Sequence, residues 1–273
     1  MINKKAGLTS FQSLNQIKKD FSTPKVGHTG TLDKFASGLL VVLMERALKL
    51  ARYFSDCDKE YTGTIRFGAE TDTLDPEGAV IAEADPPELD RLLQVLPDFR
   101  GDIVQRPPEY SAIHIGGKRA SALARAGTTV EMPARPVTIH ALELLSYKKP
   151  DAKIRVHCSK GTYIRSLARD IGGAAGSCGH LIELTRTAVA GFSLEQADGN
   201  LHTIDPELFS LLGIPVLYVD EDAASGLIHG TPVDPLIPGS APALTALFCE
   251  DSLVAIVEPD AKGLWRYGCV YAN

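Results

Sequence analysis

An acidic residue that ends a glycine-rich stretch is the first candidate for chemistry. Residues 27–33 read GHTGTLD, with two glycines three residues apart and polar side chains between them, which predicts a tight polar turn. The periodic apolar segment that follows predicts a helix, and Asp33 would then lie near its N-terminus, where the backbone dipole favours a carboxylate. Asp33 is therefore either a helix cap or a catalytic acid. Ala36 stands where a capping box has Glu or Gln, so the cap would be incomplete.

A second candidate segment, KGTYIRSL at residues 160–167, contains Lys160, Tyr163 and Arg165. On a helical wheel Tyr163 and Arg165 flank an apolar stripe on opposite sides, so neither is an obvious core residue. Arg165 and Arg169 are four residues apart, and two like charges on one helix surface are mildly unfavourable. An anionic partner would explain this pair: a phosphate, a carboxylate such as Asp33, or both. Two solvated arginines would explain it equally well.

The third candidate is Tyr61, which follows Lys59 and Glu60 at the head of a predicted strand. A binding site for a nucleic-acid base needs a flat apolar platform, although a strand tyrosine is more commonly a packing residue. Other catalytic signatures are missing: the sequence has no complete phosphate-binding loop, no dinucleotide fingerprint, no G-x-S-x-G and no paired zinc-ligand motif. This pattern indicates chemistry that needs neither a cofactor nor a metal.

Hydrophobic periodicity predicts the elements that would position these side chains. Apolar residues at steps of three and four from Phe35 to Phe54 predict a long amphipathic helix. Strict alternation over residues 153–159 predicts a strand with one buried face and one basic face. The remaining predicted elements are strands at 61–67 and 80–82, a loop at 70–78, a helix from Leu89, and a helix from Ile164 that ends at Gly172-Gly173.

Charge is unevenly distributed along the 273 residues, which carry a formal net charge of −6. Residues 1–60 have ten Lys and Arg against six Asp and Glu, and residues 100–170 have thirteen against six. Residues 191–273 have two against twelve. Since phosphate binding depends on local positive surface, the two basic blocks are compatible with a nucleic-acid face, although solvated surface explains them as well.

The composition predicts a cytoplasmic protein with a large α+β domain and a small β unit. No secretory signal follows the basic pair at the start, and the longest strongly apolar run, Leu39 to Met44, is too short for a membrane span. The five cysteines lack a C-x-x-C motif, so we expect reduced thiols. Beyond residue 200 proline and glycine become frequent, and we place a boundary near residues 199–213.

Taken together, the motifs resemble the TruB family of tRNA pseudouridine synthases over roughly residues 3–195. The matching segments occur in the family's order and approximate spacing: KKAGLTSF, GHTGTLDKFASGLL, KEYTGTIRFGAETDTLD, RPPEYSAIHIGGKRA, VHCSKGTYIRSLARDIG and LIELTRTAVAGF. The resemblance implies a mixed-sheet catalytic domain, which we assign to residues 1–205, and a small β-barrel (PUA-like) domain, which we assign to residues 206–273. It also implies a monomer that uses no cofactor and acts on the TΨC arm of tRNA.

The resemblance also implies roles for individual residues. Asp33 matches the family's essential aspartate, and Arg165 matches the arginine that pairs with it and would lower its pKa. Tyr61 matches the tyrosine that stacks on the target base. The implied substrate-binding residues are His28, Tyr163 and Leu184, to which we add two cations within the matching motifs, Lys5 and Lys160.

Some positions depart from the family pattern, and other functions stay open. Lys34-Phe35 and Ser37 replace the usual Pro-Leu and Thr, and Thr185 stands where an arginine is usual. The acidic C-terminal segment is unusual for a module that touches RNA. The alternatives are a synthase for another RNA, a non-catalytic tRNA-binding protein or folding chaperone, and a hydrolase that uses Asp33 with a second acid.

Overall fold

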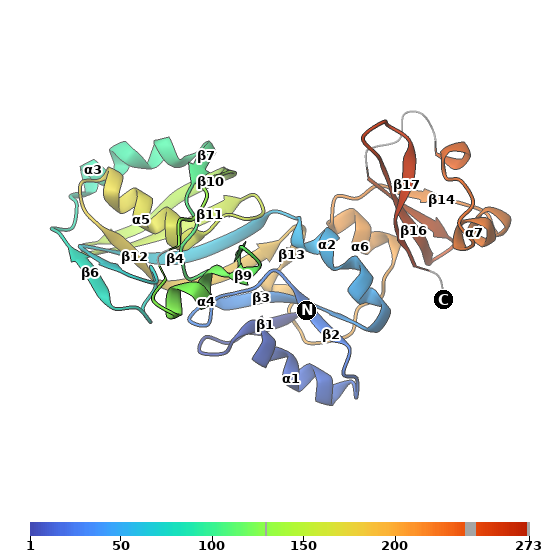
Figure 1. Cartoon of the computed structure of the whole chain (residues 1–273), viewed down its shortest axis with the longest axis horizontal. Helices are drawn as coiled ribbons and strands as arrows, with labels where there is room; N and C mark the ends of the chain where they lie inside the picture. The colour runs from blue at the N-terminus through green and yellow to red at the C-terminus, as the bar shows by residue number, and fades with distance from the viewer. Residues whose placement is uncertain (129, 238–243, 272–273) are drawn as a thin grey trace.

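The chain folds into two lobes of unequal size (Figure 1). The computed structural model describes residues 1–128, 130–237 and 244–271. The larger lobe contains a nine-stranded mixed sheet with helices, and the smaller lobe contains a four-stranded sheet. The α+β class expected from the sequence is confirmed.

The nine-stranded sheet brings together segments that are distant in the sequence. Its main path runs β1-β3-β12-β4-β11-β10-β7, with β2 paired to β3 and β13 paired to β12. Only β3 and β12 pair in parallel within this sheet as described. The strands are β1 Ile2–Lys4, β2 Val26–Thr29, β3 Ser37–Met44, β4 Lys59–Phe67, β7 Gly101–Gln105, β10 Arg135–Lys148, β11 Asp151–Cys158, β12 Gly179–Val189 and β13 Phe192–Ser193.

Helix α5 (Ile164–Ala174) packs on one face of this sheet and closes the main core. Its buried stripe meets apolar residues of β4, β10, β11 and β12, and α3 (Leu89–Val95) with the 3-10 turn η2 (Leu96–Phe99) packs beside it. The predicted end at Gly172-Gly173 is wrong by one to two residues. A Cβ on Gly172 would lie 2.7 Å from the backbone of Cys178, so this glycine permits close packing rather than ending the helix.

The long helix predicted from Phe35 to Phe54 is wrong. The segment forms strand β3, then the 3-10 helix η1 (Glu45–Leu50) and the short α2 (Ala51–Ser55). Leu39, Leu40 and Val41 are all buried, because β3 lies between β1 and β12 inside the sheet. A nearly continuous apolar run fits a helical stripe and a strand buried on both faces equally well.

The other predicted elements of the large lobe are confirmed within a few residues. The strands at 61–67 and 153–159 lie in β4 and β11, and the strand at 80–82 is β6 (Val80–Glu83). The predicted loop at 70–78 overlaps the short strand β5 (Ala69–Thr71). Strands β1, β2, β7, β10, β12 and β13 have no sequence-based prediction. The same holds for α1 (Ser10–Asp20), β8 (His114–Ile115), β9 (Lys118–Arg119) and α4 (Ala120–Arg125).

The small lobe has a sheet of order β14-β15-β16-β17. Short apolar runs at residues 246–249 and 253–257, which agree with the expected small β unit, lie in its two central strands. Within the residues described, these strands form an open sheet and no closed barrel is found. The elements after the large sheet are η3 (Leu194–Gln196), α6 (Pro206–Leu211), β14 (Val216–Tyr218), α7 (Glu221–Ile228), η4 (Asp234–Leu236), β15 (Thr245–Cys249), β16 (Ser252–Pro259) and β17 (Trp265–Val270).

One hydrophobic cluster includes residues of both lobes. Leu50, Tyr53 and Phe54 from η1 and α2 belong to the same cluster as Phe209 and Phe248 of the small lobe. The domain boundary after residue 205 stays a prediction. Across the described part of the chain, no helix is both long enough and apolar enough to cross a membrane.

Candidate active site

Asp33 lies in the loop between β2 and β3, not at a helix N-terminus as predicted. Two contacts hold this loop against the N-terminal segment. The Ser10 hydroxyl donates to the carbonyl of Leu32 at 3.0 Å and accepts from its backbone N–H at 2.9 Å. The buried Lys4 ammonium donates to the carbonyl of Ala36 at 2.6 Å. The carboxylate is therefore positioned by its loop anchors instead of by a helix dipole.

Arg165 reaches Asp33 from the first turn of α5. Its Nε lies 2.8 Å from Asp33 Oδ2, and its second terminal nitrogen donates to Oδ1 at 3.2 Å. The guanidinium also donates to the carbonyls of Thr73 at 2.7 Å and Tyr110 at 2.9 Å. Arg165 is not a solvated arginine, since its side chain is only 3 % exposed. Asp33, one of the anionic partners considered from the sequence, contacts it.

Asp75 is a second carboxylate on the same guanidinium, and sequence analysis did not single it out. Its Oδ2 lies 3.4 Å from a terminal nitrogen of Arg165, and the residue is 6 % exposed. Thr73 donates its hydroxyl to Asp75 Oδ1 at 2.6 Å, and the backbone of Glu77 donates to the same oxygen at 3.0 Å. These bonds leave one oxygen of Asp75 free to face Arg165.

Burial raises the pKa of Asp33 above its ordinary value. Although 36 % of the side chain is exposed, protein atoms surround the carboxyl closely enough that loss of water is the largest influence on its pKa. Arg165 and Lys4 lower the pKa, whereas the neighbouring charge of Asp75 raises it. The sequence-based expectation that Arg165 lowers the pKa of Asp33 is therefore wrong in its net direction. The effect of the guanidinium is smaller than the combined effect of burial and of the second carboxylate, Asp75.

Tyr61 and Leu184 form an apolar wall beside this group. Tyr61 lies on β4 and packs against the main hydrophobic cluster, to which Leu184 of the neighbouring β12 belongs. Burial raises the pKa of the Tyr61 hydroxyl, so the side chain is a neutral phenol at ordinary pH. A phenol ring and a leucine beside a carboxylate can hold a flat ring with a polar edge.

His28 and Tyr163 lie on two different elements of the site. His28 is on β2, and its Nδ1 is buried without a hydrogen-bond partner in the described residues. Burial lowers the pKa of His28, which favours the neutral ring. Tyr163 precedes α5, where Gln105 of β7 bonds both its backbone N–H and its carbonyl, and the Arg135 guanidinium lies 5.0 Å from its ring centre.

Comparison with known proteins identifies the family. The model of the TruB family pseudouridylate synthases (N-terminal domain) matches residues 18–164. A tRNA pseudouridine synthase B of Francisella philomiragia is 47 % identical over 228 residues, which are 81 % of this chain and 76 % of that protein. The chain belongs to the TruB family. A tRNA pseudouridine synthase B of Borreliella burgdorferi is 46 % identical over 200 residues, 72 % of this chain and 71 % of that protein.

Solved structures agree with this membership at the level of the fold. A chain of a Cbf5–Nop10–Gar1 complex superposes with a TM-score of 0.72 at 26 % identity, over 99 % of this chain and 84 % of that chain. A chain of an H/ACA RNP bound to a substrate RNA gives a TM-score of 0.69 at 23 % identity. This TruB family member is therefore a pseudouridine synthase, an isomerase, with the mixed-sheet fold expected from the resemblance.

The two lysines predicted to bind substrate lie on the surface of this TruB family member. Lys5 is exposed, and Lys160 is exposed and lies 3.0 Å from Asp56. In the part of the chain that the structure describes, neither lysine bonds to Asp33 or Arg165. Lys4, the neighbour of Lys5, is the buried lysine that holds the Asp33 loop. Two adjacent lysines do not reveal in sequence which one is buried.

Two of the departures from the family pattern meet in space. Ser37 of β3 and Thr185 of β12 are partners in the parallel pair, and their hydroxyl oxygens lie 3.0 Å apart. A small hydroxyl pair thus fills the position where an arginine is usual. Lys34, the residue after Asp33, forms a salt bridge of 3.0 Å with Glu77, which follows Asp75 by two residues. This pair links the two loops that carry the carboxylates.

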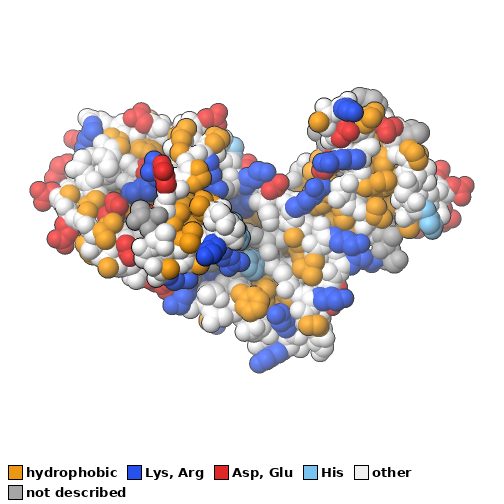
Figure 2. Space-filling view, viewed as in Figure 1, with side chains coloured by type: hydrophobic (Ala, Val, Ile, Leu, Met, Phe, Trp, Pro, Cys, Tyr) orange, Lys and Arg blue, Asp and Glu red, His pale blue; other side chains and the backbone are white. Residues whose placement is uncertain are grey.

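Charged side chains separate by region on the surface. Figure 2 shows Lys and Arg side chains over α1 and the centre of the large lobe, while Asp and Glu side chains gather at the outer edges of both lobes. The basic block of residues 1–60 therefore supplies positive surface on the side of the molecule that includes α1. The uneven distribution of charge along the sequence therefore corresponds to separate basic and acidic regions of the surface.

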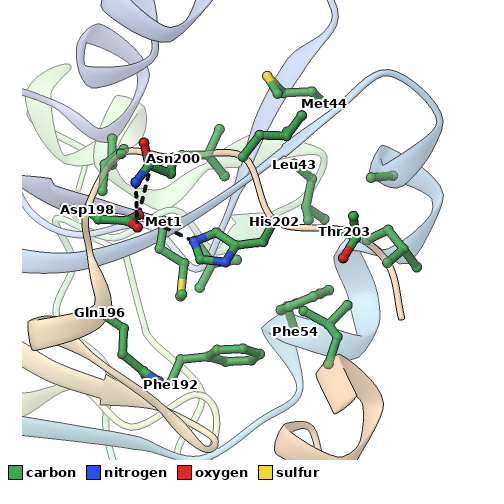
Figure 3. A pocket seen from close by; sticks show the side chains of 18 of the residues that line it. Met1, Leu43, Met44, Phe54, Phe192, Gln196, Asp198, Asn200, His202 and Thr203 are labelled. Carbon is green, nitrogen blue, oxygen red and sulfur yellow. Dashed lines mark hydrogen bonds and ion pairs between the residues drawn. The ribbon is translucent and has the colours of Figure 1, made fainter. Parts of the chain in front are cut away.

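A cavity of about 810 Å³ lies away from these residues. It is lined by the N-terminal residue, β3, α2, the segment after η3 and α6, and Figure 3 shows His202 pointing into it near Phe54 and Phe192. Asp33, Arg165 and Tyr61 do not line it. No cluster of three or more His, Cys, Asp or Glu that could hold a metal ion occurs among the described residues.

Proposed function

We propose that this TruB family member converts the uridine at position 55, in the TΨC arm of tRNA, to pseudouridine, with Asp33 as the catalytic carboxylate. The observation that carries the proposal is the two-point contact of Arg165 with Asp33 beside the Tyr61 and Leu184 wall. The relatives named tRNA pseudouridine synthase B support tRNA as the substrate. Uridine at another RNA position is the alternative that the assay below separates.

The reaction needs the groups that the site contains. Pseudouridine forms when the N1–C1′ bond breaks, the base rotates and a C5–C1′ bond forms. The C5 hydrogen leaves to solvent as a proton, and N1 takes up a proton. This is an isomerisation without redox change, so an ionised acid and a held base suffice, and we propose no cofactor. The target base leaves the stack, and Tyr61 stacks on it while Leu184 packs against it. Asp33 adds to the base, attacks C1′ or removes a sugar proton; the proposal is common to the three routes.

The remaining proposed contacts concern RNA outside the reacting base. His28, with a buried unpartnered nitrogen, would hold the remodelled RNA loop, and Tyr163 would line the pocket beside Arg165. Lys5 and Lys160 are exposed cations available to phosphates. A PUA-like role for residues 206–273, a monomeric state and a cytoplasmic location complete the proposal.

Tritium release from tRNA tests the proposal directly. An unmodified tRNA transcript with tritium at uridine C5 is incubated with the purified protein, and label is released to water only where the C5 hydrogen is exchanged. We expect release at one site in the parent and none with Asp33→Asn. Asp98→Asn, an exposed acid on η2, serves as the matched control and should release label at the parent rate.

The outcomes separate the rival functions. Tight tRNA binding without release in the parent would indicate a binding protein or chaperone, and release from another RNA alone would change the substrate. Free uracil among the products would indicate hydrolysis. An Asp33→Asn variant that still forms pseudouridine would remove Asp33 from the catalytic role.

A further inference from the structure

Arg186, on β12, is the largest of the fully buried side chains in the described residues. It is 1 % exposed, and none of the described carboxylates forms an ion pair with it. Burying a charge without a counter-charge costs several kcal/mol unless hydrogen bonds replace the lost water. A buried arginine of this kind depends on its hydrogen bonds. The groups that accept hydrogen bonds from Arg186 therefore indicate what the side chain does.

The two acceptors of Arg186 belong to segments on either side of Asp33. Its Nε donates to the carbonyl of Leu39 on β3 at 2.8 Å, and a terminal nitrogen donates to the carbonyl of Gly30 at 3.0 Å. Gly30 has a φ of +74°, and a Cβ there would lie 3.3 Å from the guanidinium. One side chain therefore fixes the GHTGTLD loop before Asp33 to the strand after it.

Arg186 also faces the aromatic ring of the site. It is the cross-strand partner of Tyr61 on β4, and Leu184, two residues earlier on β12, shares its face of the sheet. The Arg186 guanidinium lowers the pKa of the Tyr61 hydroxyl, whereas burial, the larger influence, raises it. The ring expected to hold the base and the loop of the catalytic acid thus share one neighbour, Arg186.

We propose that Arg186 is a positioning residue for pseudouridine formation, one that fixes the Gly30 carbonyl and the Tyr61 ring relative to each other. The inference rests on the proposed roles of Asp33 and Tyr61. Because Arg186 is buried, it does not reach an RNA phosphate, and its removal acts on the chemical step instead of on RNA binding. A misplacement of reacting groups by about 1 Å lowers a rate by roughly 100-fold.

Arg186→Lys keeps the charge and loses the planar donor that reaches two acceptors. We expect kcat for tritium release to fall between about 10-fold and 100-fold while KM for tRNA changes less than about twofold. The matched control is Arg155→Lys, an exposed arginine on β11, which should keep both parameters. Parent kcat in Arg186→Lys, or a rise in KM alone, would overturn the positioning role.

Tyr61→Phe tests the shared contact from the other side. In the parent it removes the hydroxyl of the ring that is the cross-strand partner of Arg186, and in the Arg186→Lys background its further effect on kcat should shrink by at least about threefold. Additive effects would overturn the coupling. If Arg186→Lys does not fold, Arg186→Gln, which keeps an amide donor, replaces it in the cycle. A Tyr61→Phe enzyme with parent kcat would overturn the contact in any case.

Other results would contradict the proposed function. A parent protein that releases no tritium, or an Asp33→Asn variant that keeps activity, would remove the catalytic assignment and leave the Arg186 contacts without a proposed role. Parent-like rates in Arg186→Lys with an inactive Asp33→Asn would remove only the positioning role.

Discussion

At the scale of single residues, two carboxylates compete for one buried guanidinium. Arg165 contacts Asp33 at 2.8 Å and Asp75 at 3.4 Å, so its charge is shared between a partly exposed acid and a buried one. Asp33 then sits between opposing influences: burial and Asp75 raise its pKa, and Arg165 lowers it. Substitutions of Arg165 and of Asp75 should move the pKa of Asp33 in opposite directions.

Arg165→Gln should raise the pKa of Asp33 further, because it removes the guanidinium charge in contact with the carboxyl. Since the ionised acid is the active form, activity is lost as pH falls through this pKa. We expect the acid limb of the kcat/KM profile to move to higher pH than in the parent, and kcat at neutral pH to fall at least about 100-fold. The pH profile of tritium release measures both, and an unmoved acid limb would contradict the prediction.

Asp75→Asn should shift the acid limb the other way. The substitution removes a neighbouring negative charge, so the pKa of Asp33 falls and the limb moves to lower pH. Because Arg165 also loses an anchor, kcat at neutral pH should fall, by about 10-fold or more. The same pH series measures this shift. A limb displaced in the same direction as for Arg165→Gln would show that Asp75 does not act through its charge.

At the scale of elements, the ordered motifs single out Asp33, Tyr61 and Arg165, while the element after Asp33 is predicted wrongly. The structure brings Asp33 and Arg165 into contact, and β4 and α5 carry Tyr61 and Arg165. Strand β3 was mistaken for a helix because it is apolar on both faces, and nothing in its pattern shows that β1 and β12 enclose it. Asp75 and Arg186 lie in the ordered motifs too and were missed, because no local pattern shows that each is buried against a partner, 90 and 156 residues away.

Gly38 tests the packing of β3 against β12. Its φ is +108°, and a Cβ would lie 2.3 Å from the carbonyl oxygen of Arg186, so Gly38→Ala must push the parallel strands apart. We expect the free energy of unfolding to fall by about 3 kcal/mol or more, measured from urea transitions. Gly101→Ala is the control, since Gly101 has a φ of +81° with open space around it. If the free energy of unfolding falls equally in the two variants, φ strain alone explains the loss, and the close contact with Arg186 contributes nothing.

At the scale of the whole molecule, the lobes are joined by packing and differ in charge. The shared cluster is accompanied by a charged contact, in which Arg52 of α2 and Arg266 of β17 each lie 2.9 Å from an oxygen of Glu258. One of the two small-lobe cations is therefore engaged in an ion pair. On α1 of the large lobe Lys19 is exposed and Lys18 is half-buried, which matches the charge separation in Figure 2.

Salt dependence of tRNA binding should identify the lobe that binds phosphate. Each phosphate contact releases counterions, so losing one lowers the slope of log affinity against log salt by up to about one. Lys18→Ala with Lys19→Ala, on α1, should weaken binding and lower the slope by up to about two. Lys262→Ala, an exposed cation of the small lobe, should leave the slope unchanged. The reverse result would place the phosphate contacts on the acidic lobe, despite its net charge, and would favour an RNA-binding role for the PUA-like unit.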